Sequence, residues 1–262
     1  MLRLKGEDKA KMLARATLES LLREHKLDRT LAVFPTGLRA PRTETVATGH
    51  PRADQCLEGG WPRGQLSVVC GPASAGRTTL VVGTLAEVTR AGELAALVDA
   101  ADCFDPVPAA ARGVVLERLL WVRGTFGTCG SGGSVGSMGS GGSIGGSRRP
   151  GVARALTQAV RAFDLVLRAG GFAAVVLDLS GVPARALGAL PFTTWLRLGR
   201  SVEGSRTAAV IVADAPVAPS AAGVSLDLQG ALARWRGPSA RARLFEAPAL
   251  APRLRGFRKV GR

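Results

Sequence analysis

The chain has 262 residues, 46% of them hydrophobic, which is enough for one main domain with a sizeable core and small appendages. Its 35 Lys and Arg residues against 20 acidic residues give a net charge of +15, which favours a polyanionic partner, nucleic acid first and a membrane surface second. No window offers the roughly 18 apolar residues of a membrane span, and the first residues lack an apolar signal core, so we expect a soluble cytoplasmic protein. Four scattered cysteines with no CxxC pair suggest neither a zinc site nor a disulfide framework.

The first part of the chain carries an amphipathic pattern. Residues 7–26 place apolar side chains at helical spacing with Lys and Arg between them, which predicts a helix. Pro and Gly residues from Pro35 to Pro41 end this unit. We therefore divide the chain into residues 1–47, an N-terminal helix and linker, and residues 48–262, a core domain.

Strand and helix patterns alternate along the core domain. Buried strands are predicted at residues 65–70, 94–100, within 116–122, at 172–180 and at 207–214, and helices at 78–91, 152–167 and 192–200. Alternating strands and helices form βαβ units, so the sequence predicts an α/β fold with a mostly parallel central sheet flanked by helices. The tail from Ser225 onward alternates enough to predict edge strands, for which an antiparallel arrangement is open.

A low-complexity segment interrupts the core. Residues 124–147 are almost all Gly and Ser, a composition that buries too little apolar surface to offset the entropy of ordering, so we expect a flexible loop. Its root-mean-square reach would be about 25 to 30 Å. A tolerated surface insertion is the favoured interpretation, and a segment that folds on binding a partner is the other.

The stretch from Gly71 to Thr79, GPASAGRTT, follows a predicted strand and opens a predicted helix, which is the context of a phosphate-binding loop. Its glycines allow backbone N–H groups to turn toward phosphate oxygens, and Thr78 fits the hydroxyl that binds magnesium. The basic residue is Arg77 where such loops have Lys, and a planar guanidinium does not present the same compact point charge. A plain strand-to-helix turn is the alternative.

On these motifs the chain resembles the RecA family across most of its length. The N-terminal helix resembles that family's oligomerising helix, residues 48–79 its approach to the phosphate loop, LVDAADCFDP at 97–106 the segment after its second strand, and VVLDLS at 175–180 its acidic strand. The GGWPRG and LLWVRG stretches and the Arg-rich tail more specifically resemble ImuA, a RecA-like accessory protein of damage-induced mutagenesis.

The resemblance implies ATP with Mg²⁺ as the cofactor and assigns residues to it. Thr78 and Asp178 would lie beside the metal ion. The nucleotide-binding positions are Gly71, Ser74, Ala75, Gly76, Arg77, Thr78, Thr79, Asp105 and Asp178.

The chain differs from the family at the sequence positions whose side chains carry out ATP hydrolysis. Ala101 occupies the position of the glutamate that activates the attacking water, and loss of a general base usually costs a factor of about 100 to 10,000 in rate. Asp102 points in a different direction and is a poor substitute. Pro108 replaces the adenine-stacking tyrosine, and Asp214 places an anion where the family's glutamine senses the terminal phosphate. We therefore assign no catalytic residue, and expect that nucleotide could still bind but is not hydrolysed.

The segment that corresponds to a DNA-binding loop of the family also lacks basic residues. No Lys or Arg lies between Ala213 and Leu232, so this loop cannot neutralise phosphates. Positive charge and aromatic residues gather later, a mixture suited to backbone contact with base stacking, although a solvated edge strand with core aromatics explains it equally well. The DNA-binding candidates are Arg234, Trp235, Arg236, Arg253, Arg255, Arg258 and Lys259.

Three functional hypotheses follow. The first is a RecA-like interaction protein of DNA repair or translesion synthesis in the SOS response, which binds single-stranded DNA without sequence preference, RecA filaments or a polymerase subunit, with homo-oligomerisation open. The second is a weak DNA-dependent ATPase of homologous recombination. The third is a RecA-like regulator unrelated to DNA.

Overall fold

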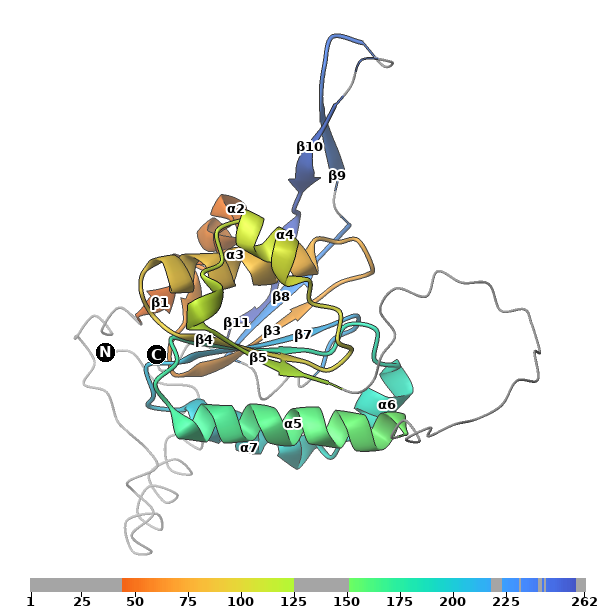
Figure 1. The fold of residues 1–262 in the computed structure, drawn as a ribbon. Helices are drawn as coiled ribbons and strands as arrows, with labels where there is room; N and C mark the ends of the chain where they lie inside the picture. The colour runs from red at the N-terminus through yellow and green to blue at the C-terminus, as the bar shows by residue number, and fades with distance from the viewer. Residues whose placement is uncertain are drawn as a thin grey trace, which may run out of the picture. The chain divides into compact units, whose positions relative to one another are not determined.

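The computed structural model describes residues 44–124, 151–217, 223–230, 232–239, 242 and 244–257, all within one compact unit, Thr43–Val260 (Figure 1). The helix predicted at residues 7–26 lies outside the described residues. So do Arg258, Lys259 and, apart from Gly124, the Gly/Ser segment.

A seven-stranded sheet lies at the centre of this unit, in the order β11-β8-β3-β7-β6-β4-β5. Neighbouring strands run parallel, except that β11 is antiparallel to β8. The predicted α/β fold with a mostly parallel sheet is therefore confirmed. The strands are β3 (Gln65–Cys70), β4 (Ala95–Asp99), β5 (Leu119–Arg123), β6 (Ala174–Asp178), β7 (Ala208–Ala213), β8 (Val224–Leu228) and β11 (Pro252–Phe257).

Helices cover both faces of the sheet (Figure 1). One face carries α2 (Pro51–Cys56), α3 (Arg77–Arg90) and α4 (Pro106–Ala111), together with the short β1 (Thr45–Val46) and β2 (Trp61–Pro62). The other face carries α5 (Val152–Ala169), α6 (Ala184–Gly188) and α7 (Phe192–Val202).

Each central strand contributes to two hydrophobic cores. In β3, Val69 packs under α3 while Val68 packs under α5 to α7, and Leu97 and Val98 of β4 divide in the same way. Side chains alternate between the faces of a sheet, so a strand buried on both faces must be a continuous apolar run. This is why the sequence pattern identified these strands.

The predicted boundaries hold to within about two residues in the centre of the sheet and differ at its margins. Leu116–Arg118 forms a short 3₁₀ turn before β5. β8 is not an edge strand, because it lies between β3 and β11 and buries Val224, Leu226 and Leu228. The strands β9 (Leu232–Arg236) and β10 (Leu244–Ala249) pair with each other as a separate antiparallel hairpin.

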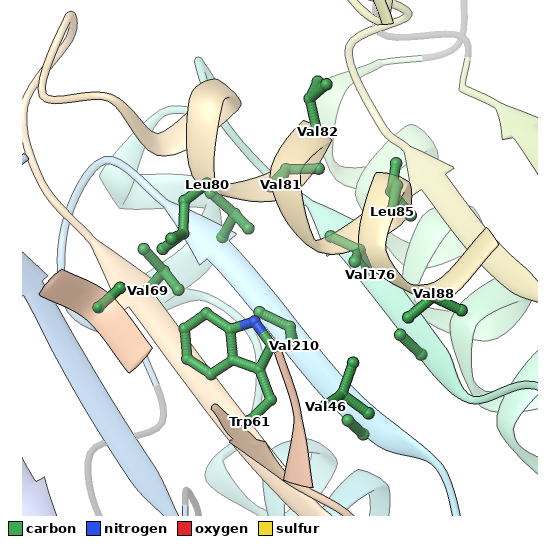
Figure 2. Close-up of a cluster of buried hydrophobic side chains, with 14 of the residues drawn as sticks. Val46, Trp61, Val69, Leu80, Val81, Val82, Leu85, Val88, Val176 and Val210 are labelled. Atoms are coloured by element: carbon green, nitrogen blue, oxygen red, sulfur yellow. The ribbon is translucent and has the colours of Figure 1, made fainter. Parts of the chain in front are cut away.

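Trp61 occupies the middle of the core under α3. Figure 2 shows its ring among aliphatic side chains from β1, β3, β7 and α3, and the residue is 1% exposed. Its indole Nε1 donates a hydrogen bond to Thr84 Oγ1 at 3.0 Å, and the Thr84 hydroxyl donates to Leu80 O at 2.9 Å. A buried indole N–H needs such an acceptor, so Thr84 fixes the orientation of the ring.

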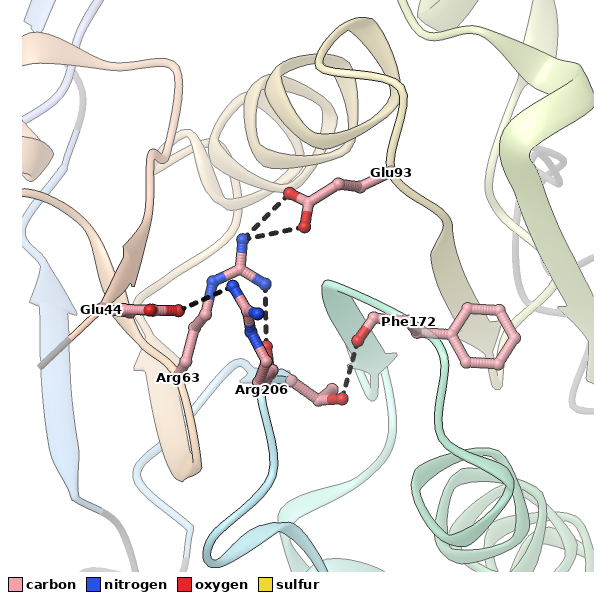
Figure 3. Close-up of polar contacts among 6 residues, drawn as sticks. Glu44, Arg63, Glu93, Phe172 and Arg206 are labelled. Carbon is pink, nitrogen blue, oxygen red and sulfur yellow. Dashed lines mark hydrogen bonds and ion pairs between the residues drawn. The ribbon is translucent and has the colours of Figure 1, made fainter.

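A polar network ties the amino ends of the strands together (Figure 3). Arg63, just before β3, donates to the carbonyl oxygen of Arg206 at 2.8 Å and pairs with Glu93, just before β4, at 2.9 Å. Arg206, just before β7, pairs with Glu44 at 3.1 Å. Because the opposite ends of the strands are free of this network, the connections there are available to form a site.

We predict that Thr84→Val lowers the free energy of unfolding by about 1 to 3 kcal/mol, because it removes the acceptor of the buried Trp61 N–H without changing the shape of the side chain. Thermal denaturation should show a loss of a few degrees for a protein of this size. Thr84→Ser keeps the hydroxyl and is the control. Equal losses for the two variants would show that the hydrogen bond is not the cause.

Candidate functional site

The candidate site lies at the carboxyl edge of the parallel strands, where ligands bind in open α/β sheets. β3 ends at Cys70 and continues into the phosphate-loop stretch, β4 and β6 end in Asp99 and Asp178, and β7 is followed by Asp214. β3 and β7 are direct neighbours, with Cys70 opposite Ala213. The loop after β3 and Asp214 are thereby brought together.

The phosphate-loop stretch has the backbone of an anion-binding turn. Ser74 and Gly76 have positive φ angles of 63° and 93°, and α3 begins immediately after Gly76 with no side-chain cap. The first N–H groups of a helix have no partner within the helix, and left-handed residues next to them make a concavity that favours anions. The φ angle of Gly76 strains any residue with a Cβ, and a Cβ there would also displace the end of the Leu250 side chain.

The basic side chain of this loop is already paired. The Arg77 guanidinium is 9% exposed and contacts the Asp214 carboxylate through Nη1 and Oδ1. The second oxygen, Oδ2, accepts a hydrogen bond from the backbone N–H of Gly181 at 3.1 Å, in the turn after β6. A phosphate group that approached Arg77 would therefore meet an anion of the chain itself.

The pairing of Arg77 with Asp214 is not predictable from the sequence. In the sequence they are two separate departures from the family, whereas in the structure they form one interaction across 137 residues of chain. The only signal in the sequence is that the longer cation and the extra anion occur together.

Ala101 lies where the resemblance to the RecA family implies a general base. Ala101 is 3% exposed and offers no group that could accept a proton. Its neighbour Asp102 has a φ of 56° and receives two hydrogen bonds from Arg123, at 2.7 and 2.8 Å. These bonds lower the pKa of the Asp102 carboxyl, which makes it a weaker base.

Arg123 also lies over an aromatic ring. Its guanidinium carbon is 4.8 Å from the centre of the Trp121 ring, which packs edge-on against Phe104 with the ring centres 5.3 Å apart. No local sequence pattern predicts this cluster, because its members come from two strand ends that only the sheet order brings together. Both carboxylate oxygens of Asp102 are engaged by Arg123 within it.

Two carboxyl groups lie side by side at the ends of β4 and β6. Asp99 and Asp178 are register partners, and each accepts a local backbone N–H, from Phe104 at 2.7 Å and from Ser180 at 2.8 Å. Burial raises the pKa of the Asp178 carboxyl, and the neighbouring Asp99 adds to this. Hydrogen bonds from Ser180 and, more weakly, the charge of Arg77 act in the opposite direction. Asp178 is thus at the strand end expected for a magnesium-side acid, and its hydrogen bond to the turn also gives it a structural role.

The other side chains predicted to contact the nucleotide lie on different elements. Thr78 is exposed at the first turn of α3. Asp105 caps α4, because its carboxylate accepts the N–H of Val107 at 3.0 Å. Within the described ranges no group of three or more His, Cys, Asp and Glu side chains could hold a metal ion. The φ angles of the loop backbone fit an anion, whereas the paired Arg77 and the alanine at position 101 do not fit the hydrolysis of ATP with Mg²⁺.

The predicted DNA-binding residues fall on two different elements. Arg253 and Arg255 are exposed on β11, and Arg253 is the register partner of Asp227 on β8. Arg236 is exposed at the end of β9, and the backbone of Arg234 and Trp235 belongs to the same strand. None of the helices in the described part of the chain is long and apolar enough to cross a membrane.

Comparison with known proteins bears on the phosphate-loop half of the site. Residues 30–129 match the family model of the RecA N-terminal domain. Over this segment the chain is related to the RecA family. The Protein RecA of Synechococcus sp. (strain WH7803) is 49% identical over 79 residues, which cover 30% of this chain and 21% of that protein. Those of Prochlorococcus marinus strains MIT 9211 and NATL1A are 49% and 48% identical over 79 residues, with 30% of this chain and 22% and 21% of those proteins covered. The alignments thus span about a fifth of these RecA-like relatives.

We predict that Asp178→Asn stabilises the protein at neutral pH and that the gain shrinks on acidification. The raised pKa means that the folded state holds this proton more tightly than the unfolded chain, so ionisation of Asp178 opposes folding as the pH rises above its ordinary pKa of 3.8. Asparagine keeps an acceptor for the Ser180 N–H. Urea unfolding at about pH 4 and pH 7 measures the effect.

Asp102→Asn is the control with the opposite sign. The pKa of Asp102 is lowered, so its contribution to stability is present above the ordinary pKa and is lost as the pH falls. This variant should therefore lose stability at neutral pH and approach the wild type in acid. The same pH dependence in both variants would contradict the assignment.

Proposed function

We propose that this chain is a RecA-like protein of DNA repair and damage tolerance that acts by binding and not by ATP hydrolysis. In this role it resembles the ImuA type of accessory protein in translesion mutagenesis, with DNA, RecA or a polymerase subunit as its partner. The relation of residues 30–129 to the RecA N-terminal domain supports the link to recombination and repair.

The observation that carries the proposal is the ion pair between Arg77 and Asp214. A buried guanidinium needs a counter-ion, and here a carboxylate of the chain provides it. In a phosphate loop that hydrolyses ATP, the nucleotide neutralises the cation. The attraction between cation and phosphate then contributes to nucleotide binding and stabilises the phosphoryl group during transfer. With Arg77 already paired and alanine at position 101, two contributions to catalysis are absent together.

Retention of the anion-binding backbone favours one second candidate, a weak DNA-dependent ATPase. Ser74 and Gly76 keep the left-handed conformations that direct N–H groups into the loop. A nucleotide could then be held by the backbone alone, as a ligand that stabilises the fold. Measurement of turnover separates this candidate from the binding role.

We expect negligible ATP hydrolysis by the pure protein, with or without DNA. Arg77→Lys combined with Ala101→Glu should recover little, because the new lysine would still face Asp214, whereas adding Asp214→Gln should raise the rate measurably. Glutamine can still accept the N–H of Gly181 and a hydrogen bond from residue 77. Phosphate release is the measurement for all variants.

A melting curve for each variant is the control for folding, because removal of the charge at position 214 leaves a buried cation without its counter-ion. Binding of a fluorescent ATP analogue to folded Asp214→Gln should exceed binding to the wild type. Sustained DNA-stimulated phosphate release by the wild-type protein would refute the binding-only role.

We further expect DNA binding to be non-specific, strongly dependent on salt and carried by the C-terminal basic tract. Each neutralised phosphate adds roughly 0.7 to 0.9 to the slope of log affinity against log salt concentration. Changing Arg253, Arg255, Arg258 and Lys259 to Gln should flatten this slope, and Trp235→Ala should weaken single-strand binding by about 1 to 3 kcal/mol if the indole stacks on a base. Unchanged affinity and slope would place the DNA contact elsewhere, with the cations of residues 5–15 as the next candidate.

A further inference from the structure

The backbone of the phosphate loop carries donors that the described part of the chain leaves unused. Five successive or nearly successive N–H groups donate to no acceptor among the described residues: those of Ser74, Gly76, Arg77, Thr78 and Thr79. The first N–H groups of a helix need partners from outside the helix, and the oxygens of a phosphate group supply them. Because these donors belong to the backbone, they remain available whatever the Arg77 side chain does.

The side chain of the loop treats successive phosphates of a ligand differently. In phosphate loops the backbone N–H groups surround the inner phosphates, and the basic side chain reaches the outermost ones. Here the basic side chain, Arg77, is 9% exposed and is paired with Asp214. A diphosphate group therefore keeps the backbone donors, whereas a third phosphate lacks the cation on which its binding would depend.

Asp214 is held in this position by two partners. Its Oδ1 contacts Arg77 Nη1, and its Oδ2 accepts the backbone N–H of Gly181 at 3.1 Å. The side chain is nevertheless 44% exposed, so part of its charge lies open beside the cation that an outer phosphate would approach. Like charges that are brought together weaken binding, and a carboxylate held from two sides cannot move away without losing both contacts.

We propose that the phosphate loop binds a diphosphate group, that of a nucleoside diphosphate or of inorganic pyrophosphate, in preference to a triphosphate, and that Asp214 determines this preference. The inference rests on the proposed binding function, because it names the ligand class for a loop that does not support hydrolysis. A diphosphate bound there is a ligand that stabilises the loop and not the product of a reaction.

A DNA backbone fits the same loop less well. Each of its phosphodiesters has one charge and only two oxygens that are free of ester bonds, so one such group satisfies fewer of the five unused N–H groups than a diphosphate does. A triphosphate has enough oxygens, but its outermost charge lies next to Asp214. The diphosphate is the ligand that uses the donors and avoids the carboxylate.

The test is isothermal titration calorimetry of the full-length protein with two pairs of ligands in the presence of Mg²⁺. The first pair is ADP and the non-hydrolysable ATP analogue AMP-PNP, and the second is inorganic pyrophosphate and tripolyphosphate. We expect the diphosphate to bind about 10-fold more tightly than the triphosphate, since the third phosphate adds repulsion and no contact with a free cation. A preference in both pairs assigns the loop to the diphosphate group itself. A preference in one pair alone assigns it to the nucleoside diphosphate or to pyrophosphate.

Asp214→Asn is the decisive variant, because it removes the charge and keeps an acceptor for the Gly181 N–H. It should raise the affinity for AMP-PNP about 10-fold and remove the preference for ADP, since Arg77 is then free to contact the third phosphate. Asp102→Asn is the matched control. It neutralises another carboxylate that pairs with an arginine, Arg123, and should leave the preference unchanged.

Arg77→Gln combined with Asp214→Asn guards against a folding defect in the single variant, because it removes both charges of the buried pair. A melting curve shows which variants are folded. In the double variant the two affinities should agree within about threefold, since neither a carboxylate nor a cation then distinguishes the ligands. Tighter or equal binding of AMP-PNP by the wild type, an unchanged preference in the folded variants, or no binding of any of the four ligands would overturn the proposal.

The titrations do not depend on turnover, because AMP-PNP is not hydrolysed. A wild-type protein that prefers AMP-PNP and releases no phosphate from ATP would refute the ligand preference and leave the binding-only role intact. Sustained phosphate release would refute the binding-only role, whatever the order of affinities.

Discussion

The ion pair between Arg77 and Asp214 determines what the carboxyl edge of this sheet can do. Arg77 is buried at the start of α3, where a cation without a counter-ion would be strongly destabilising. Asp214 provides the counter-ion and also accepts the N–H of Gly181, so one carboxylate connects the phosphate loop, the end of β7 and the turn after β6. The connections that surround a nucleotide in a working enzyme are thus held together by the chain itself.

Arg77 depends on Asp214 more than Asp214 depends on Arg77. Removal of Asp214 would leave the buried guanidinium without its counter-ion, whereas the Asp214 side chain is 44% exposed and would stay solvated without Arg77. Arg77 without Asp214 would need a phosphate to neutralise it, and Asp214 without Arg77 would repel one. Together they neutralise each other within the chain, which agrees with the binding role proposed above.

Most of the fold could be predicted from the sequence because it depends on local patterns. Continuous apolar runs identified β3, β4, β6 and β7, and helical spacing identified α3, α5 and α7. The margins were less predictable. β8 alternates between buried and half-buried residues as an edge strand does, yet β11 pairs with it and encloses it, and such pairing depends on how distant segments meet.

The candidate site was predictable residue by residue but not as an arrangement. The strand order β3-β7-β6-β4 determines which strand ends are neighbours. No local sequence pattern specifies that order. For this reason the positions of Arg77, Ala101 and Asp214 could be identified as departures, whereas the contact between the first and the last could not. For the same reason the sequence does not predict the contact between Asp102 and Arg123, which come from two separate elements.

The end of β7 connects the phosphate loop with the helical face that carries α6. Asp214 contacts Arg77 and accepts the Gly181 N–H, and Ala215, Pro216 and Val217, which follow it directly, line a hollow together with Leu187 and Trp195. A segment anchored at its first residue has fewer conformations to lose when it is ordered. The ion pair therefore restrains the start of this connection as well as the phosphate loop.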